Sequence, residues 1–281
     1  MNIVWTESRI SRMAKEGRGK GAGSQYRPWL EAPEVSSLGL ASRQFCPKTG
    51  RIHHYLSKGE SDFHSLLAWN PDVVDIREQF PLSRNVTRPV AAELGIKHPY
   101  YPGTHVETVM TVDFMVTRIR NGEEITEAYD AKCAEDLEDP RTLEKLEIMR
   151  AALGQGEILH RIVCHETLPK RKVANLQWIE KGAVLPAEAE ERQGFFDDYC
   201  QRMLSDFQRA SKAVRLNEYC ESFDQRFAVN TGTGLRLARV LMSKRELLPD
   251  FEQPELENAP LGSFSVAPEM QQQRFAVGGA R

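Results

Sequence analysis

The stretch from Thr111 to Lys132 constrains the fold of this chain more than any other segment. Two runs that alternate apolar and polar residues flank the dipeptide Asn121-Gly122, which favours the positive φ angles of a two-residue hairpin turn. We therefore predict two antiparallel strands over this stretch. Because the start of one strand then lies beside the end of the next, Asp113 is expected close to Asp130 and Lys132.

The expected patch combines two carboxylates with one ammonium group. Asp130 and Lys132 are two residues apart, so their side chains share one face of the sheet. Two neighbouring carboxylates repel each other as anions and attract a cation, and oxygen ligands without thiolate or imidazole suit Mg²⁺. Such a metal activates water and polarises phosphate, while the lysine orients that water or balances the developing charge. The pattern is typical of a metal-dependent phosphodiester hydrolase; the plain alternative is a surface hairpin with one solvated salt bridge.

Seven short motifs follow one another over about residues 10–180. They are Lys15–Gly19, Tyr26–Leu30, Lys48–His54, Asp75–Leu82, Gly95–Pro99, Val109–Phe114 and Arg141–Glu147. In this order and at this spacing, the chain resembles the TnsA family, the endonuclease subunits of heteromeric transposases.

The resemblance implies a fold and a set of site residues. The fold is α/β and restriction-endonuclease-like, with a mixed sheet flanked by helices. The catalytic residues implied are Glu60, Asp113, Asp130 and Lys132. The first three, with the carbonyl group of Ala131, are expected to hold Mg²⁺ or Mn²⁺, as two ions. The best-known member of the family has glutamine in place of Asp130, so this chain lies closer to the general Asp…(Asp/Glu)-x-Lys nuclease pattern.

The local sequence gives Glu60 a competing role. Ser57 is a plausible N-cap of a helix over residues 57–69, and Glu60 three residues later completes a capping-box pattern. Capping and metal binding exclude each other for one side-chain conformation, and the resemblance favours the metal. In a strand expected over residues 73–82, Glu78 and Gln79 either approach this site or belong to the paired charges of a half-buried strand.

The N-terminal end of the chain is basic although the whole chain is not. The net charge is −3, but residues 1–60 hold ten Lys or Arg against five Asp or Glu. We therefore expect contacts to DNA phosphates from this end, through Arg18, Lys20 and Arg51. The glycine-rich segment Gly17–Gly23 is either this basic arm or simply a flexible one. It is not a phosphate-binding P-loop, because that motif needs Ser or Thr directly after Gly-Lys, and Lys20 is followed by glycine.

Cysteine and histidine positions indicate no metal site of their own. The five cysteines, at 46, 133, 164, 200 and 220, are scattered and lack CxxC spacing, which favours a reduced protein of the bacterial cytoplasm. His53 and His54 lie on an expected strand, where adjacent side chains face opposite sides, so they are poor joint ligands for one metal. The sequence has no signal peptide and no run of about 18 apolar residues, so no membrane contact is expected.

The chain is expected to form two domains, a catalytic domain over residues 1–180 and a helical domain over 181–281. The segment from 183 to 191 is acidic and carries Ala and Pro, as a linker does. The second domain combines helical patterns with a tail at 246–270 suited to a short hairpin, which favours a winged-helix-like unit. By resemblance this unit binds the AAA+ regulator TnsC.

The resemblance implies an Mg²⁺-dependent DNA endonuclease that cuts the 5′ strands at transposon ends. A separate DDE-type transposase, TnsB, would cut the 3′ strands. Two other readings remain open from the residues. One is a stand-alone restriction or repair endonuclease of the same fold, and the other is a DNA-binding scaffold whose carboxylates hold no metal.

Overall fold

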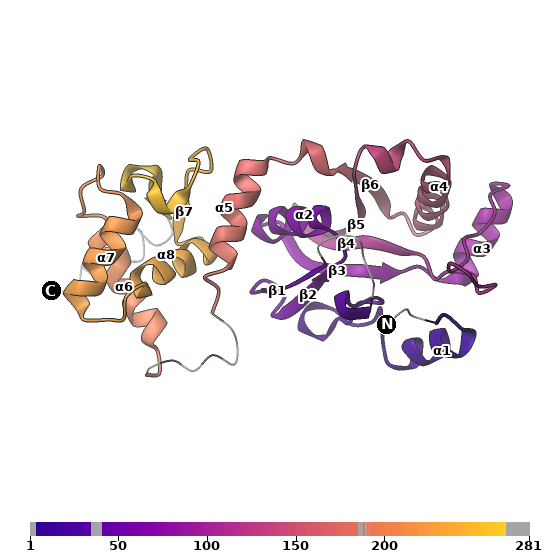
Figure 1. Ribbon diagram of the computed structural model, residues 1–281, viewed down its shortest axis with the longest axis horizontal. Coiled ribbons are helices and arrows are strands. Elements are labelled where there is room, and N and C mark those ends of the chain that lie inside the picture. Colours follow the sequence, from indigo (N-terminus) through magenta and orange to yellow (C-terminus); the bar gives the residue numbers. More distant parts are fainter. Residues whose placement is uncertain (1–3, 35–40, 185–187, 189, 191, 268–281) are drawn as a thin grey trace. The chain divides into compact units, whose positions relative to one another are not determined.

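The computed structural model describes residues 4–34, 41–184, 188, 190 and 192–267. The chain divides into two compact units, Met1–Leu168 and Pro169–Arg281 (Figure 1). This division lies ahead of the boundary expected at residue 180. Residues 185–187, 189 and 191 of the expected linker lie outside the described residues.

The helix α5 (Lys170–Glu180) explains the difference in the boundary. Its Trp178 lies against the guanidinium group of Arg239, which is 4.2 Å from the ring centroid, and donates a hydrogen bond to Glu257. The amide of Asn175 donates to the backbone of Gln253. All of these partners belong to the second unit, so α5 is part of that unit. The sequence of α5 could not reveal this, since its apolar side chains fit either neighbour.

A four-stranded sheet forms the centre of the first unit. The strands are β3 (Val73–Pro81), β4 (Thr111–Arg120), β5 (Glu123–Lys132) and β6 (Leu159–Cys164), in that order across the sheet. The β3–β4 and β4–β5 pairs are antiparallel, and β6 runs parallel to β5 (Figure 1). The sheet is therefore mixed, as expected for this α/β fold.

The hairpin of β4 and β5 is the one that the sequence indicates. Asn121 and Gly122 have φ angles of 52° and 82°, the positive pair that a type I′ turn requires. Phe114 pairs with Tyr129 across the two strands. The next position along each strand brings Asp113 beside Asp130, so the turn sets the register of the acidic patch.

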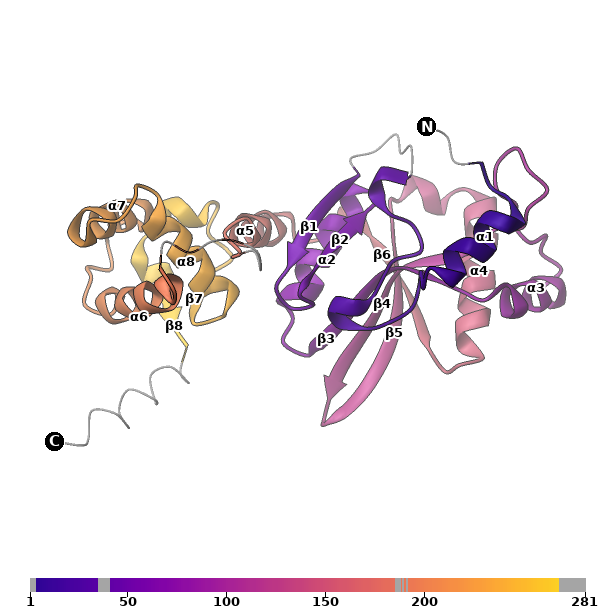
Figure 2. The same cartoon turned by 90° about the horizontal axis from the view of Figure 1, so that it is seen from below.

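Helices cover both faces of the sheet. On one face, α2 (Lys58–Trp69) packs Phe63 and Leu67 against Phe114. On the other face lies α4 (Pro140–Gly154), which is the crossover between β5 and β6, with Met149 in the same cluster as Met115. Because successive residues of β4 point to opposite faces, one strand supplies both cores. The helix α3 (Arg84–Glu93) packs beside α4 (Figure 2).

The remaining elements of the first unit precede or connect these. They are α1 (Glu7–Lys15), the antiparallel hairpin of β1 (Ser42–Cys46) and β2 (Arg51–Tyr55), and 3₁₀ turns at Gly23–Gln25, Ala32–Glu34, Glu135–Leu137 and His165–Thr167. The β1–β2 hairpin is the strand pair expected around Thr49-Gly50, and it lies close to α2 and β3.

The second unit is mostly helical, as expected. Its elements are α5, α6 (Phe195–Phe207), α7 (Leu216–Phe227), α8 (Thr233–Ser243), the strands β7 (Leu247–Pro249) and β8 (Phe264–Val266), and 3₁₀ turns at Leu256–Asn258 and Leu261–Ser263. The two short strands pair antiparallel where the sequence suggests a hairpin. Its own core is fully buried, with Phe207, Phe223, Leu237 and Leu241 almost without exposed surface. Within the described residues, no helix combines the length and apolarity that a membrane span needs.

Candidate active site

The hairpin brings together the three residues that the sequence places near each other. Nζ of Lys132 lies 2.9 Å from Oδ2 of Asp113 and 3.2 Å from Oδ1 of Asp130. The amide of Ala131 also donates to Oδ2 of Asp113, at 2.9 Å. The lysine thus bridges two carboxylates at the end of the β4–β5 hairpin.

Burial and like charge determine the protonation of this cluster. Burial raises the pKa of Asp113 to about 6, with Asp130 adding to the shift and Lys132 opposing it. For Asp130 burial acts in the same direction, but Lys132 and His160 outweigh it and hold its pKa below the ordinary value. Burial alone would lower the pKa of Lys132, yet the two carboxylates raise it, so the lysine is cationic. One ammonium group therefore balances more than one buried acid.

Glu60 enters the same cluster from the first turn of α2. Its backbone amide donates to the Ser57 hydroxyl, which is the expected N-cap, and its Oε2 accepts from the amide of Leu56 at 2.9 Å. Burial raises the pKa of Glu60 to about 8, and the neighbouring charge of Asp113 adds to the shift. Ser57 therefore caps the helix as expected, whereas the Glu60 carboxylate bonds to Leu56 and not to the backbone of the N-cap residue.

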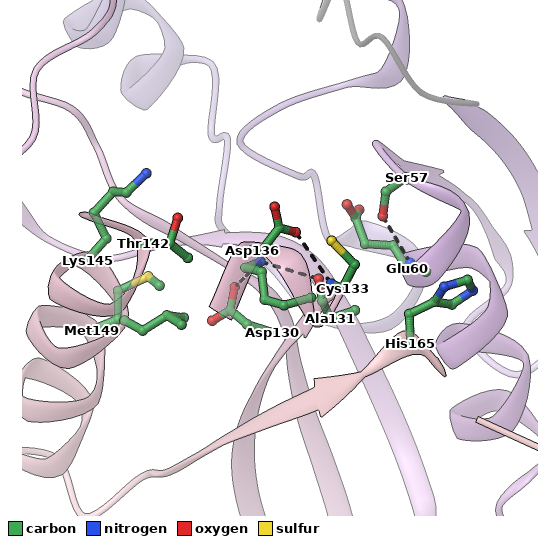
Figure 3. Close-up of a pocket in the computed structure, with 13 residues that line it drawn as sticks. Ser57, Glu60, Asp130, Ala131, Cys133, Asp136, Thr142, Lys145, Met149 and His165 are labelled. Carbon is green, nitrogen blue, oxygen red and sulfur yellow. Dashed lines mark hydrogen bonds and ion pairs between the residues drawn. The ribbon is translucent and has the colours of Figure 1, made fainter. Parts of the chain in front are cut away.

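Glu60, Asp130 and Lys132 line a pocket of about 450 Å³ (Figure 3), and Asp113 contacts Lys132. Glu60 lies on the α2 side, Asp130 and Ala131 lie at the end of β5, and Lys145 of α4 lies on the opposite side. The pocket is open to solvent and is lined by buried acids and by two lysines, Lys132 and Lys145. It can accept an anionic substrate such as a phosphodiester together with a cation.

The donor set fits a hard divalent cation. Glu60, Asp113 and Asp130 offer carboxylate oxygens, and the carbonyl of Ala131 lies 3.4 Å from Nζ of Lys132, at the same location. Raised pKa values for Glu60 and Asp113 indicate buried acids that lack enough positive charge around them. A cation with oxygen ligands removes that deficit, and Mg²⁺ and Mn²⁺ are the usual choices.

Gln79 supports Glu60 from β3. Its amide Nε2 donates to Oε2 of Glu60 at 3.3 Å, while its Oε1 accepts from the Thr111 hydroxyl at 3.1 Å. Gln79 has a φ angle of 48°, a left-handed conformation that a residue other than glycine rarely adopts within a strand. The sequence left two roles open for Glu78 and Gln79, and in the structure each residue has one of them. Gln79 approaches the site, whereas Glu78 forms an internal ion pair with Arg51.

Two residues near the site were not anticipated from the sequence. Nε2 of His160 lies 2.6 Å from Oδ2 of Asp130, and both side chains are buried. Lys145 is the other, on the wall of the pocket. The sequence showed His160 only as a polar residue near the start of β6. Its contact with Asp130 depends on the parallel pairing of β6 with β5, which the sequence did not give.

The residues expected to contact DNA differ in their surroundings. Arg18 is buried and pairs with Glu34, with its Nη2 at 2.8 Å from Oε1, and Arg51 is buried and pairs with Glu78. Both guanidinium groups are therefore used inside the fold, which does not favour contact with phosphate. Lys20 is exposed and remains available for such a contact.

Comparison with known proteins agrees with this architecture. Residues 70–165 match the family described as TnsA-like endonuclease N terminal, and residues 168–251 match the family described as TnsA endonuclease C terminal. The two matches meet where the chain divides into its two units. The chain is also 42% identical over 178 residues to the Transposon Tn7 transposition protein TnsA of Escherichia coli. That alignment covers 63% of this chain and 64% of the relative, so it spans less than two thirds of the relative's length. By both family matches and this identity, the chain belongs to the TnsA family.

Proposed function

We propose that this chain is a metal-dependent DNA endonuclease that cuts the 5′ strands at transposon ends. The observation that carries the proposal is that Glu60, Asp130 and Lys132 line one open pocket and that Asp113 contacts Lys132. The family descriptions name an endonuclease, and the printed name of the relative places that protein in transposition.

The proposed ligands of the cation are Glu60, Asp113, Asp130 and the carbonyl of Ala131. When bound there, Mg²⁺ or Mn²⁺ as one or two ions would supply a water of lowered pKa and a Lewis acid for a phosphate oxygen. The chain itself orients these ligands. The amide of Ala131 fixes Oδ2 of Asp113, and Gln79 with the amide of Leu56 fixes Oε2 of Glu60. Oδ1 of Asp130 contacts Lys132, and Oδ2 contacts His160. To bind a cation, Asp130 must give up its contact with Lys132.

Lys132 is proposed to stabilise negative charge on the phosphate in the transition state and to orient the attacking water. Its ammonium group lies between Asp113 and Asp130, so its position is fixed before substrate binds. A compact ammonium group fits this position, whereas a guanidinium group is longer and planar. Lys132→Arg is therefore expected to lose cleavage, and Lys145→Arg, on the pocket wall, is the matched control that retains most of it.

The proposal is tested by a strand-specific cleavage assay on DNA that carries a transposon end, with and without the partner transposase. We expect cleavage of the 5′ strand that requires Mg²⁺ or Mn²⁺ and the transposase. Asp113→Ala should reduce the rate by roughly 10³-fold or more, since a metal centre contributes several kcal/mol to the barrier. Unchanged cleavage by Asp113→Ala would exclude the assigned site.

The same assay separates the two other readings. Cleavage by the purified chain alone, at a sequence of its own, would indicate a stand-alone restriction or repair endonuclease. Absence of Mg²⁺ and Mn²⁺ binding in calorimetry, with normal transposition by Asp113→Ala, would indicate a DNA-binding scaffold.

For the second unit we propose a role in partner binding. It has a complete core of its own around Phe207, Phe223 and Leu241, so it does not need the nuclease unit to bury its apolar side chains. By family resemblance its partner is the AAA+ regulator TnsC. Residues 1–168 should then fail to capture the regulator in a pull-down in which the full chain succeeds. Equal capture by both would place the binding surface on the nuclease unit.

A further inference from the structure

A second cluster of potential metal ligands lies inside the first unit, apart from the oxygen-rich pocket. Cys46 ends β1, His53 lies in β2 and His64 lies in α2. One ligand atom from each residue lies within 4.8 Å of the other two, and the side chains are buried, with 3%, 0% and 2% of the residue surface exposed. Three consecutive elements thus bring one sulfur and two imidazoles to a single point.

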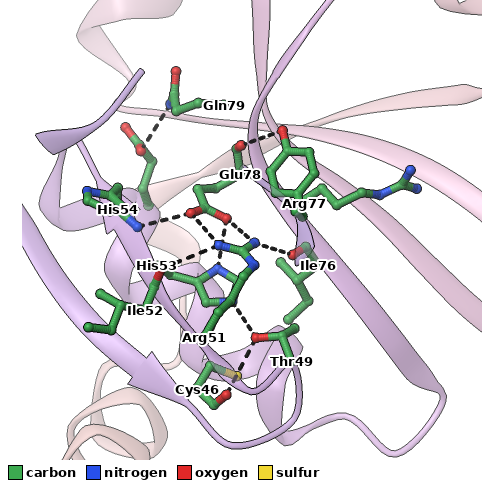
Figure 4. Close-up of polar contacts among 12 residues, drawn as sticks. Cys46, Thr49, Arg51, Ile52, His53, His54, Ile76, Arg77, Glu78 and Gln79 are labelled. Atoms are coloured by element: carbon green, nitrogen blue, oxygen red, sulfur yellow. Dashed lines mark hydrogen bonds and ion pairs between the residues drawn. The ribbon is translucent and has the colours of Figure 1, made fainter. Parts of the chain in front are cut away.

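Glu78 lies beside the His53 ring. Oε2 of Glu78 is 2.9 Å from Nδ1 of His53, on the side of the ring away from Thr49 (Figure 4). Nε2 lies 2.7 Å from the Thr49 hydroxyl, at the end of the ring that faces Cys46. A carboxylate beside one nitrogen of the imidazole is a common feature of metal-binding histidines.

His64 supplies the independent sign of a missing partner. The residue is 2% exposed, and its Nε2 has no hydrogen-bond partner among the described residues. A buried polar nitrogen without a partner costs about 1–3 kcal/mol, so such groups are uncommon in native proteins. The ring lies next to His53, with 4.4 Å between the centroids.

We propose that Cys46, His53 and His64 form a structural site for Zn²⁺ or a similar transition metal, with the fourth position beside the Thr49 hydroxyl. One sulfur and two nitrogen ligands suit zinc and not magnesium, so the site is chemically distinct from the oxygen-rich pocket. The competing account is a metal-free hydrogen-bond network among the same three residues.

Such a site would support the position of Glu60. His64 follows Glu60 by one helical turn in α2, so both side chains lie on the same face of that helix. A metal at His64 ties α2 to the β1–β2 hairpin, and through the contact of His53 with Glu78 it reaches β3. The next residue of β3 is Gln79, which hydrogen-bonds to Glu60.

The test is a Co²⁺ titration of the purified, metal-stripped full chain, followed by absorption spectroscopy. Cobalt bound to a thiolate in tetrahedral geometry gives an intense ligand-to-metal band and strong visible bands, which oxygen ligands do not give. We expect one equivalent with this spectrum, and its displacement by Zn²⁺. Cys46→Ser should lose the thiolate band. Cys133→Ser is the matched control and should keep it, since Cys133 is the cysteine that lines the oxygen-rich pocket.

A wild-type spectrum with only weak octahedral bands would overturn the proposal, and so would loss of the thiolate band in Cys133→Ser with retention in Cys46→Ser. Folding of the variants is checked by circular dichroism. His64→Phe offers a second variant that keeps an aromatic ring in the core. Zn²⁺ should raise the Tm of the wild type and leave that of His64→Phe unchanged; an equal rise in both would also contradict the site.

Discussion

The first unit contains two sites with buried acids, which are linked by the neighbouring residues Glu78 and Gln79 of β3. The acids at the two sites have opposite electrostatic surroundings. Glu78 has no exposed surface, and it is paired with Arg51 and accepts a hydrogen bond from the amide of His54 at 3.1 Å. Beyond Gln79, Asp113 and Asp130 share the ammonium of Lys132, and the charge of Asp113 also acts on Glu60, the third acid of this group. We call the first the Glu78 cluster and the second the Glu60 cluster.

The pKa of Glu78 moves in the opposite direction to the pKa values of Glu60 and Asp113, whereas the pKa of Asp130 is lowered like that of Glu78. Burial would raise the pKa of Glu78, but His53 and Arg51 outweigh it and hold the pKa far below its ordinary value. In the Glu60 cluster, burial and mutual repulsion raise the pKa of Glu60 and of Asp113. A buried acid that is fully compensated supports the fold, whereas an undercompensated one is a candidate ligand for a cation.

The comparison predicts its largest effect on stability at Glu78. Glu78→Ala leaves the buried guanidinium of Arg51 without its partner and should reduce the free energy of unfolding by about 3–5 kcal/mol. Urea denaturation at pH 7.5 measures this change. Because the folded pKa of Glu78 is depressed, its contribution is present above the unfolded pKa and is lost as pH falls below that value, so the variant should also be less sensitive to acid. A loss below about 1 kcal/mol would remove the distinction between the clusters.

A second prediction concerns the pH dependence of metal binding to the Glu60 cluster. With pKa values of about 8 for Glu60 and about 6 for Asp113, each acid must release its proton before it binds a cation. The affinity for Mg²⁺ should therefore rise between pH 6 and 8, by up to about tenfold per pH unit for each proton released. Calorimetry in two buffers of different ionisation enthalpy counts these protons. An affinity that is constant over this range would contradict the raised pKa values.

Neutralising an acid of the Glu60 cluster should have a smaller effect, of opposite sign to that at Glu78. Without divalent cations at pH 8, Glu60→Gln removes a charge whose folded pKa is raised, so it should increase the free energy of unfolding by about 1 kcal/mol. The same substitution should weaken Mg²⁺ binding and cleavage. Glu78→Gln under identical conditions is the matched control and should destabilise the fold.

The smallest effect is expected at an ion pair on the surface of α4. Glu147 and Arg150 pair within this helix at 2.6 Å, with 38% and 63% of their side-chain surfaces exposed. Solvent screens such pairs, so Glu147→Ala should leave the Tm and the cleavage rate unchanged. A clear drop in the Tm or in the cleavage rate would mean that a surface carboxylate contributes as much as a buried one. It would contradict the distinction drawn between the Glu78 cluster and the Glu60 cluster.

Local sequence determined the central features of this protein. The Asn-Gly turn needs only two residues with positive φ, and alternation along two strands then places Asp113, Asp130 and Lys132 together. These are short-range effects, so they could be read without any tertiary contact. The cap at Ser57 and the strand pair around Thr49-Gly50 are of the same kind.

Tertiary structure decided which charges are free and which are used inside the fold. Composition made Arg18 and Arg51 resemble a DNA-binding surface, but Glu34 and Glu78, distant in sequence, take up both guanidinium groups. Likewise α5 fits either unit by its own pattern, and only its contacts with the second unit place it there. The gathering of a cysteine and two histidines could not be read from their spacing, because it depends on how α2 packs against the β1–β2 hairpin. Pairings between residues far apart depend on the packing of whole elements, and this is the physical reason that the sequence alone could not supply them.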